Sequence, residues 1–280
     1  MIPATFDYEV AESAEHAVEL LGSREDAKLL AGGHSLIPLM RLRFARPSLL
    51  VDIGRLDGLS YVRDAGEWLA IGALTRHKAV RDDPLVQEHF QIVSHTAGMI
   101  GDPQVRHRGT IGGSLAHCDP ASDMPAVMLA LEAEFVINGS DGERTVAAKD
   151  FFRGVFDSAV GPEEILTEIR LPKRGNWTGW SYLKFNRRAQ DWATVGVAAL
   201  VRHENGSDQV ADARLALTNM GATPLRAEAA EQALVAGEGD PASYIADGTD
   251  PPDDTSASPE FRSHLARVIG RRAIGEAMAR

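Results

Sequence analysis

The sequence contains one cysteine, Cys118, among 280 residues. A single cysteine cannot form a disulfide within the chain, and it cannot hold an iron–sulfur cluster, which needs several thiolate ligands. A catalytic thiol would need a placed base and a lowered pKa, and the residues around Cys118 specify neither. The zinc-deaminase pattern is also missing, because no His-x-Glu and no later Cys-x-x-Cys accompany His117 and Cys118.

Long apolar runs and excess positive charge are lacking as well. No run of 18 apolar residues occurs, so we expect no membrane span. The N-terminus lacks a charged region followed by an apolar one, so we expect no signal peptide and a cytoplasmic protein. The formal net charge of −11 disfavours nucleic acid as a partner, because phosphate binding needs a basic surface.

Two common nucleotide-binding patterns are absent. The sequence has no Rossmann G-x-G-x-x-G and no Walker G-x-x-x-x-G-K-[ST]. A dinucleotide, if bound, is therefore held in another fold. The length of 280 residues and the hydrophobic content of 44% allow two or three domains with a sizeable core.

Two glycine-rich stretches are the most informative part of the sequence. Residues 101–125 contain four glycines and three prolines, and we expect a loop with little core between a helix that ends at Gly101 and one that begins near Pro125. Its centre is TIGGS at 110–114, and a related AGGHS lies at 31–35, about 80 residues upstream. Glycine turns before helices expose backbone N–H groups. Two such turns suit a ligand with a pyrophosphate and a long body.

AGGHS followed by TIGGS and then DPASDMP resembles the FAD-binding medium subunit of the molybdenum hydroxylases. This family includes aerobic carbon monoxide dehydrogenases, nicotine- and quinoline-type dehydrogenases and the flavin domain of xanthine dehydrogenase. The resemblance covers nearly the whole chain. It implies FAD in this chain, with iron–sulfur clusters and molybdopterin only in partner subunits, a small and a large one, in a dimer of heterotrimers. It further implies an oxidoreductase subunit that takes electrons from the clusters and passes them to an external acceptor.

The resemblance also implies a set of cofactor-binding residues and no catalytic residue or metal ligand in this chain. Asp123 would accept a hydrogen bond from a sugar or ribityl hydroxyl. Lys184 would lie near the flavin, and Trp192, where other members often carry Tyr, would lie beside the isoalloxazine. The full set is Leu29, Leu30, Ala31, Gly32, Gly33, His34, Ser35, Leu36, Ile100, Thr110, Ile111, Gly112, Gly113, Ser114, Asp123, Lys184 and Trp192.

Taken without the resemblance, these residues have plainer interpretations. The glycine pairs could be ordinary strand–turn–helix connections, and His34 a polar turn residue. Asp119 and Asp123 could be N-caps of a helix over 126–131, a role that stabilises a helix by about 1 kcal/mol. Lys184 could be a solvated strand residue, and Trp192 could pack between domains.

Two other function classes stay open on the residues alone. A self-sufficient FAD oxidase would need a site base or a covalent flavin anchor, and only His34 and Cys118 are candidates for such an anchor. A non-redox module could hold another diphosphate in the glycine turns. The substrate and the electron acceptor (NAD, a quinone or oxygen) are not encoded in an identifiable motif.

We expect an α+β fold in two domains. The composition changes at residues 172–176, which places a boundary between an FAD-binding domain at 1–175, with subdomains at about 1–57 and 58–175, and a C-terminal domain at 176–280. The resemblance implies that the first domain is of the vanillyl-alcohol-oxidase (PCMH) type. The second domain should close over the flavin with a three-stranded antiparallel sheet and helices. The predicted elements of this domain are strands at 179–187, 194–203 and 210–219, with a turn at Asn205-Gly206, and helices at 225–235 and 259–278.

Overall fold

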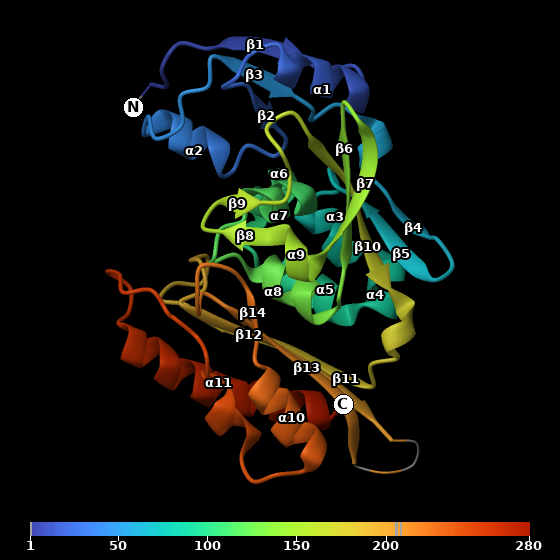
Figure 1. Cartoon of the computed structure of the whole chain (residues 1–280), viewed down its shortest axis with the longest axis vertical. Helices are drawn as coiled ribbons and strands as arrows, with labels where there is room; N and C mark the ends of the chain where they lie inside the picture. The colour runs from blue at the N-terminus through green and yellow to red at the C-terminus, as the bar shows by residue number, and fades with distance from the viewer. Residues whose placement is uncertain (1, 205–206, 208) are drawn as a thin grey trace.

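The computed structural model describes residues 2–204, 207 and 209–280 (Figure 1). Its first part is a parallel three-stranded sheet of order β1-β3-β2 with two helices. Ser13 caps the first helix, because its side chain accepts a hydrogen bond from the backbone N–H of His16 at 3.1 Å. The elements are β1 (Asp7–Val10), α1 (Ala14–Gly22), β2 (Lys28–Leu30), α2 (Leu36–Arg41) and β3 (Leu49–Asp52).

The middle part is an antiparallel five-stranded sheet of order β4-β5-β10-β6-β7 with helices on one side. Helix α1 packs against β6 and β10, which joins the first part to the second. The strands are β4 (Val62–Asp64), β5 (Trp68–Gly72), β6 (Glu134–Gly139), β7 (Gly142–Ala147) and β10 (Ile165–Pro172), with a small hairpin of β8 (Phe152–Gly154) and β9 (Asp157–Ser158). The helices are α3 (His77–Asp82), α4 (Pro84–His89), α5 (Gln91–Met99), α6 (Pro103–Arg108), α7 (Ile111–His117), α8 (Asp123–Ala130) and α9 (Ala148–Phe151).

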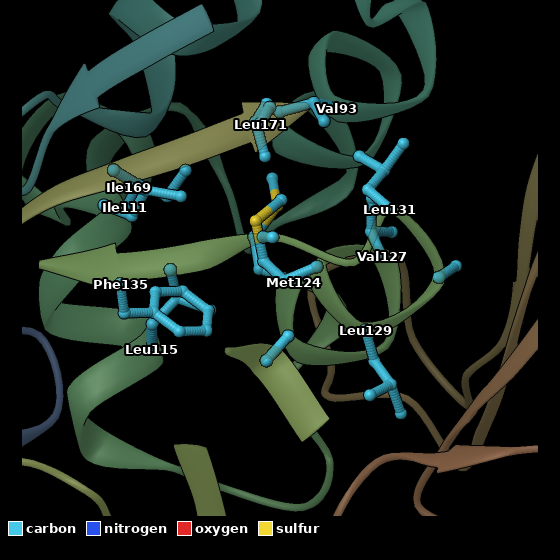
Figure 2. Close-up of a cluster of buried hydrophobic side chains, with 14 of the residues drawn as sticks. Val93, Ile111, Leu115, Met124, Val127, Leu129, Leu131, Phe135, Ile169 and Leu171 are labelled. Carbon is cyan, nitrogen blue, oxygen red and sulfur yellow. The ribbon is translucent and has the colours of Figure 1, made fainter. Parts of the chain in front are cut away.

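The main core lies between this sheet and its helices. Figure 2 shows Met124 and Val127 of α8 in this cluster with Phe135 and Ile169 from the sheet. Every residue of α8 is buried, because α8 also contacts β12 and β13 of the last sheet. A helix that is apolar all round is expected where it is covered on all sides.

The C-terminal part has a four-stranded antiparallel sheet, not the three strands expected from the sequence. The fourth strand, Leu225–Arg226, pairs with Leu217 and Ala216, so the helix expected from residue 225 begins at Glu228. The expected turn at Asn205-Gly206 lies outside the described residues. The elements are β11 (Gly179–Phe185), β12 (Val195–His203), β13 (Val210–Thr218), β14 (Leu225–Arg226), α10 (Glu228–Ala236) and α11 (Pro259–Met278).

Residues 101–125 are not the bare loop expected from their glycines and prolines. Asp102 caps α6 by accepting a hydrogen bond from the Val105 N–H at 2.9 Å, and Thr110 caps α7 by accepting one from the Gly113 N–H at 3.1 Å. The side chain of Leu115 is fully buried in the main core. Asp102-Pro103 and Thr110 are typical helix-start residues, so the sequence indicated these two helices despite its high glycine content.

The segment between α10 and α11 is held in place by Arg262. This side chain is fully buried, and its Nε donates a hydrogen bond to the Pro252 carbonyl at 3.0 Å. It also pairs with Asp254, at 2.8 Å. Among the described residues, no helix combines the length and the hydrophobicity that crossing a bilayer requires.

Candidate cofactor-binding site

A cavity of about 1060 Å³ lies where the first sheet, the helices of the middle part and the loop before β12 meet. Most of the residues predicted to bind a cofactor line it. Three do not, namely Leu30, Ile111 and Lys184. The predicted residues in its wall are Leu29, Ala31, Gly32, Gly33, His34, Ser35, Leu36, Ile100, Thr110, Gly112, Gly113, Ser114, Asp123 and Trp192.

The two glycine stretches touch each other beside this cavity. A Cβ atom at Gly32 would lie 2.4 Å from the Arg108 carbonyl oxygen and 2.8 Å from Gly109 Cα. A Cβ at Gly112 would lie 2.5 Å from the Cβ of Ala73. These two glycines are therefore required for close approach of protein backbone, where the sequence suggested close approach of a ligand.

The first stretch presents an open row of backbone amides. Within the described part of the chain, the N–H groups of residues 32–36 donate to no protein acceptor. Gly33 has φ of 77°, in the left-handed region that glycine favours. Successive free amides around such a residue form a concavity that suits an anion.

The second stretch differs, because its amides already have protein partners. The N–H of Ile111 donates to the Thr75 carbonyl at 3.0 Å and that of Gly112 to the Ala73 carbonyl at 2.9 Å. The N–H of Gly113 donates to the Thr110 side chain. The expected amide cradle is therefore open in the first stretch only. The second stretch offers the hydroxyl of Ser114, which lies 2.9 Å from that of Ser122.

Asp123 and Lys184 form a buried ion pair at the edge of the cavity. Lys184 Nζ lies 2.9 Å from Asp123 Oδ2, and Tyr182 donates its hydroxyl hydrogen to Oδ1 at 2.7 Å. Burial raises the pKa of the Asp123 carboxyl, an effect that the Lys184 ammonium and the Tyr182 hydroxyl offset only in part. Lys184 is thus not a solvated strand residue. Each carboxylate oxygen has two lone pairs, so Asp123 keeps acceptor capacity towards the cavity.

The helix-cap interpretation fails for both aspartates. The N-cap of α8 is Ser122, and Asp123 is the first residue inside the helix. Asp119 instead accepts a hydrogen bond from the backbone N–H of Ala121 at 2.9 Å, which fixes the turn before the helix.

Large aromatic side chains stand around the cavity and remain exposed. Trp192 is 55% exposed, so it does not pack between domains, and Phe44 and Phe156 line the cavity with exposures of 80% and 57%. Phe156 has φ of 56° and stacks on His117 at a centroid distance of 4.9 Å. Nothing in the sequence pattern singled out Phe44 or Phe156.

His77 is a further lining residue that no sequence pattern indicated. His77 lines the cavity although the residue is only 3% exposed. Burial, with the nearby charges of Arg106 and His34, lowers the pKa of His77 from an ordinary 6.5 to about 4. The imidazole is therefore neutral near pH 7.

Cys118 has the properties of a packed thiol. It is 2% exposed, and burial raises the pKa of its thiol to about 11. In the part of the chain that the structure describes, no three His, Cys, Asp or Glu side chains come together as a metal site requires.

Two family models match the sequence, one after the other, and together they cover nearly the whole chain. Residues 4–174 match the family described as "FAD binding domain in molybdopterin dehydrogenase", and residues 180–277 match "CO dehydrogenase flavoprotein C-terminal domain". The chain belongs to the FAD-binding medium subunits of the molybdenum hydroxylases. Members of this family are oxidoreductase subunits, and so is this chain.

Similar members of this family act in different dehydrogenases. The carbon monoxide dehydrogenase medium chain of Hydrogenophaga pseudoflava is 40% identical, with 100% of this chain and 99% of the relative covered. The 6-hydroxypseudooxynicotine dehydrogenase complex subunit alpha of Paenarthrobacter nicotinovorans is 37% identical, with 100% and 97% covered.

The fold is also that of a solved family member. The structure of H. pseudoflava carbon monoxide dehydrogenase that lacks the Mo-pyranopterin moiety contains a chain that matches with a TM-score of 0.95 and 42% identity. The match covers 100% of this chain and 99% of that one.

Proposed function

We propose that the chain holds FAD in the cavity and relays electrons from iron–sulfur clusters of a partner subunit to an external acceptor. The observation that carries this proposal is the row of free amides at residues 32–36, which ends in the same cavity as Asp123 and Trp192. An anion-binding concavity, a buried carboxylate and an exposed indole fit the pyrophosphate, the hydroxyls and the ring of a flavin dinucleotide.

Each group in the wall has a distinct task in this proposal. The amides of residues 32–36 offset the charge of the pyrophosphate. The Ser114 hydroxyl and Asp123 bond to polar groups of the cofactor, and Trp192 borders the ring from the C-terminal part. The flavin supplies the redox chemistry when it is bound, so the protein needs no acid–base pair of its own.

The partner subunits follow from what one chain of this composition can hold. A single cysteine cannot ligate an iron–sulfur cluster, and membership of the family implies that the clusters belong to a small partner subunit and molybdopterin to a large one. A dimer of such heterotrimers is the assembly we infer. The large subunit would then select the substrate. The cytoplasmic location and the absence of a nucleic-acid partner stay predictions from the sequence.

We also infer the domain limits and the fold type. The FAD-binding domain spans residues 1–175, with subdomains at about 1–57 and 58–175, and the C-terminal domain spans 176–280. The parallel sheet and the mixed helical layer on either side of the cavity support a fold of the vanillyl-alcohol-oxidase type.

A flavin titration with two matched glycine variants tests the proposal. The purified chain is titrated with FAD and reduced anaerobically while its absorbance is followed. Gly33 and Gly66 have nearly the same backbone, with φ of 77° and 76°, but only Gly33 lines the cavity. Alanine strains the backbone at both sites, and at Gly33 its Cβ would also meet the side-chain end of Ile37 at 2.7 Å, so Gly33→Ala should weaken FAD binding while Gly66→Ala should not. A chain that takes up no FAD, even with its partner subunits present, would refute the proposal.

A further inference from the structure

His77 lies behind the contact between the two glycine stretches. It is the first residue of α3, and its backbone N–H donates to the Gly109 carbonyl at 3.0 Å. Gly109 is also the residue against which Gly32 packs. His77 therefore borders the cavity together with residues 32–36 and the start of α7.

The ring of His77 has unused hydrogen-bonding capacity. Nδ1 is inaccessible to solvent and has no hydrogen-bond partner, and Nε2 makes no hydrogen bond to the described residues either. Since Nδ1 is sealed off, only the Nε2 edge of the ring can reach the cavity. A Cβ at Gly109 would lie 3.0 Å from Cδ2 and 3.4 Å from Nε2, so glycine leaves this edge uncovered. Buried polar groups without partners are rare in proteins and call for an explanation.

The surroundings of His77 favour an anion in front of the ring. Arg106 and His34 lie close enough to act on its charge state, and Arg76 is its neighbour in the chain. A neutral imidazole in this position donates a hydrogen bond without adding a further charge to be desolvated.

We propose that His77 is a further cofactor-binding residue, which donates a hydrogen bond from Nε2–H to an oxygen of the FAD pyrophosphate. This inference rests on the proposed function, because it assumes that the cavity holds FAD. The cofactor would supply a partner for Nε2–H, while the buried Nδ1, which carries no proton in this tautomer, stays unpaired.

The alternative is a histidine that only fills space beneath the glycine stretches. The two roles predict opposite effects for His77→Leu, which keeps the bulk and removes both nitrogens. A space-filling histidine can be replaced without loss of FAD affinity. A cofactor-binding histidine cannot, but its removal leaves the FAD-free chain as stable as before or more stable, because an unpaired polar group disappears.

The experiment uses the full chain and measures the FAD dissociation constant and the urea midpoint of the FAD-free form. We expect His77→Leu to weaken FAD binding about ten-fold without lowering the midpoint, and His77→Gln, which places an N–H near the Nε2 position, to recover part of the affinity. His95→Leu is the control. The side chain of His95 is exposed and hydrogen-bonds the Tyr182 carbonyl at 3.2 Å outside the cavity, so its replacement should leave FAD affinity unchanged.

A second measurement covers the case in which a variant does not fold. In the wild-type chain, the ring nitrogens of His77 are observed by NMR before and after FAD is added. We expect an Nε2–H signal that shifts on binding. Equal FAD affinity in the wild type, His77→Leu and His77→Gln, or an unchanged His77 signal, would overturn the inference. Failure of the wild type to bind FAD in the same titration would instead refute the proposed function.

Discussion

Lys184 Nζ lies 2.9 Å from Asp123 Oδ2, and this ion pair joins the C-terminal sheet to the middle of the molecule. Lys184 belongs to β11 and Asp123 to α8, and their side chains are 3% and 5% exposed. The same ammonium group donates to the Met99 carbonyl at the end of α5, at 3.0 Å. One cation thus fixes three elements around the cavity wall.

Removal of this cation should be strongly destabilising. In Lys184→Met the carboxylate of Asp123 stays buried without its ion-pair partner, so we expect a loss of about 3–5 kcal/mol in the free energy of unfolding. The double variant Asp123→Asn with Lys184→Met should recover part of this loss. Urea unfolding measures both.

The control for this prediction is an exposed ion pair in the same part of the chain. Arg271 and Asp240 are paired with side-chain exposures of 59% and 43%. Solvent screens such a pair, so Arg271→Met should cost much less than Lys184→Met. Equal losses of unfolding free energy in the two variants would show that the buried pair does not hold β11 to α8.

The contact between the glycine stretches gives a second prediction. Gly32→Ala would place a Cβ 2.4 Å from a backbone carbonyl oxygen that cannot move without shifting α6. We expect a loss of about 1–3 kcal/mol in the free energy of unfolding together with weaker FAD binding, because the strain opens the junction beside the cavity. Gly58→Ala is the control, since a Cβ there meets nothing within 4 Å. Thermal melts and FAD titrations that do not separate the two variants would contradict this explanation of Gly32.

Local sequence signals predicted much of the fold but not how its parts meet. The helix expected at 259–278 is α11, which spans Pro259–Met278. The strands expected at 179–187, 194–203 and 210–219 correspond to β11, β12 and β13. The two residues of β14 form a strand only because β13 is beside them, and no local pattern of that length can show this.

The same limit applies to the candidate site. AGGHS, TIGGS and DPASDMP identified much of the cavity wall, because the resemblance to a family rests on these residues. Gly32 packs against a backbone carbonyl at the end of α6, and Asp123 pairs with a lysine 61 positions away. The pKa of His77 is affected by neighbours in α6 and in the first glycine stretch. These relationships arise in tertiary packing, where spacing along the chain carries no information.

The lowered pKa of His77 predicts a specific loss of stability in acid. The unfolded chain takes up a proton near the ordinary pKa of 6.5, whereas folded His77 does so only near 4, so the unfolded state binds more protons between these values. Stability from this group is complete above pH 6.5 and is lost as pH falls towards 4, by at most about 3 kcal/mol.

Urea midpoints of the FAD-free chain at pH 7.5 and pH 5 test this prediction. We expect a smaller drop between the two pH values in His77→Leu than in the wild type. The raised pKa of Asp123 acts in the opposite direction, but it is common to both chains and cancels in their difference. Identical drops would show that His77 titrates normally.

Trp192 offers a test that separates cofactor contact from protein stability. Its side chain lines the cavity and is 55% exposed, so its truncation removes little protein packing. If it borders the flavin ring, Trp192→Ala should raise the FAD dissociation constant about two- to ten-fold, the equivalent of a lost aromatic contact of about 0.5–1.5 kcal/mol. Trp192→Phe keeps an aromatic face and should bind FAD nearly as the wild type does.

The unfolding midpoint should stay almost constant in both variants, because substitutions at exposed positions rarely change stability by more than about 0.5 kcal/mol. Trp68→Ala, in β5 and not among the residues that line the cavity, should leave FAD affinity unchanged. If Trp192→Ala binds FAD as tightly as Trp192→Phe, the indole does not border the ring, and the ring must lie against another part of the wall.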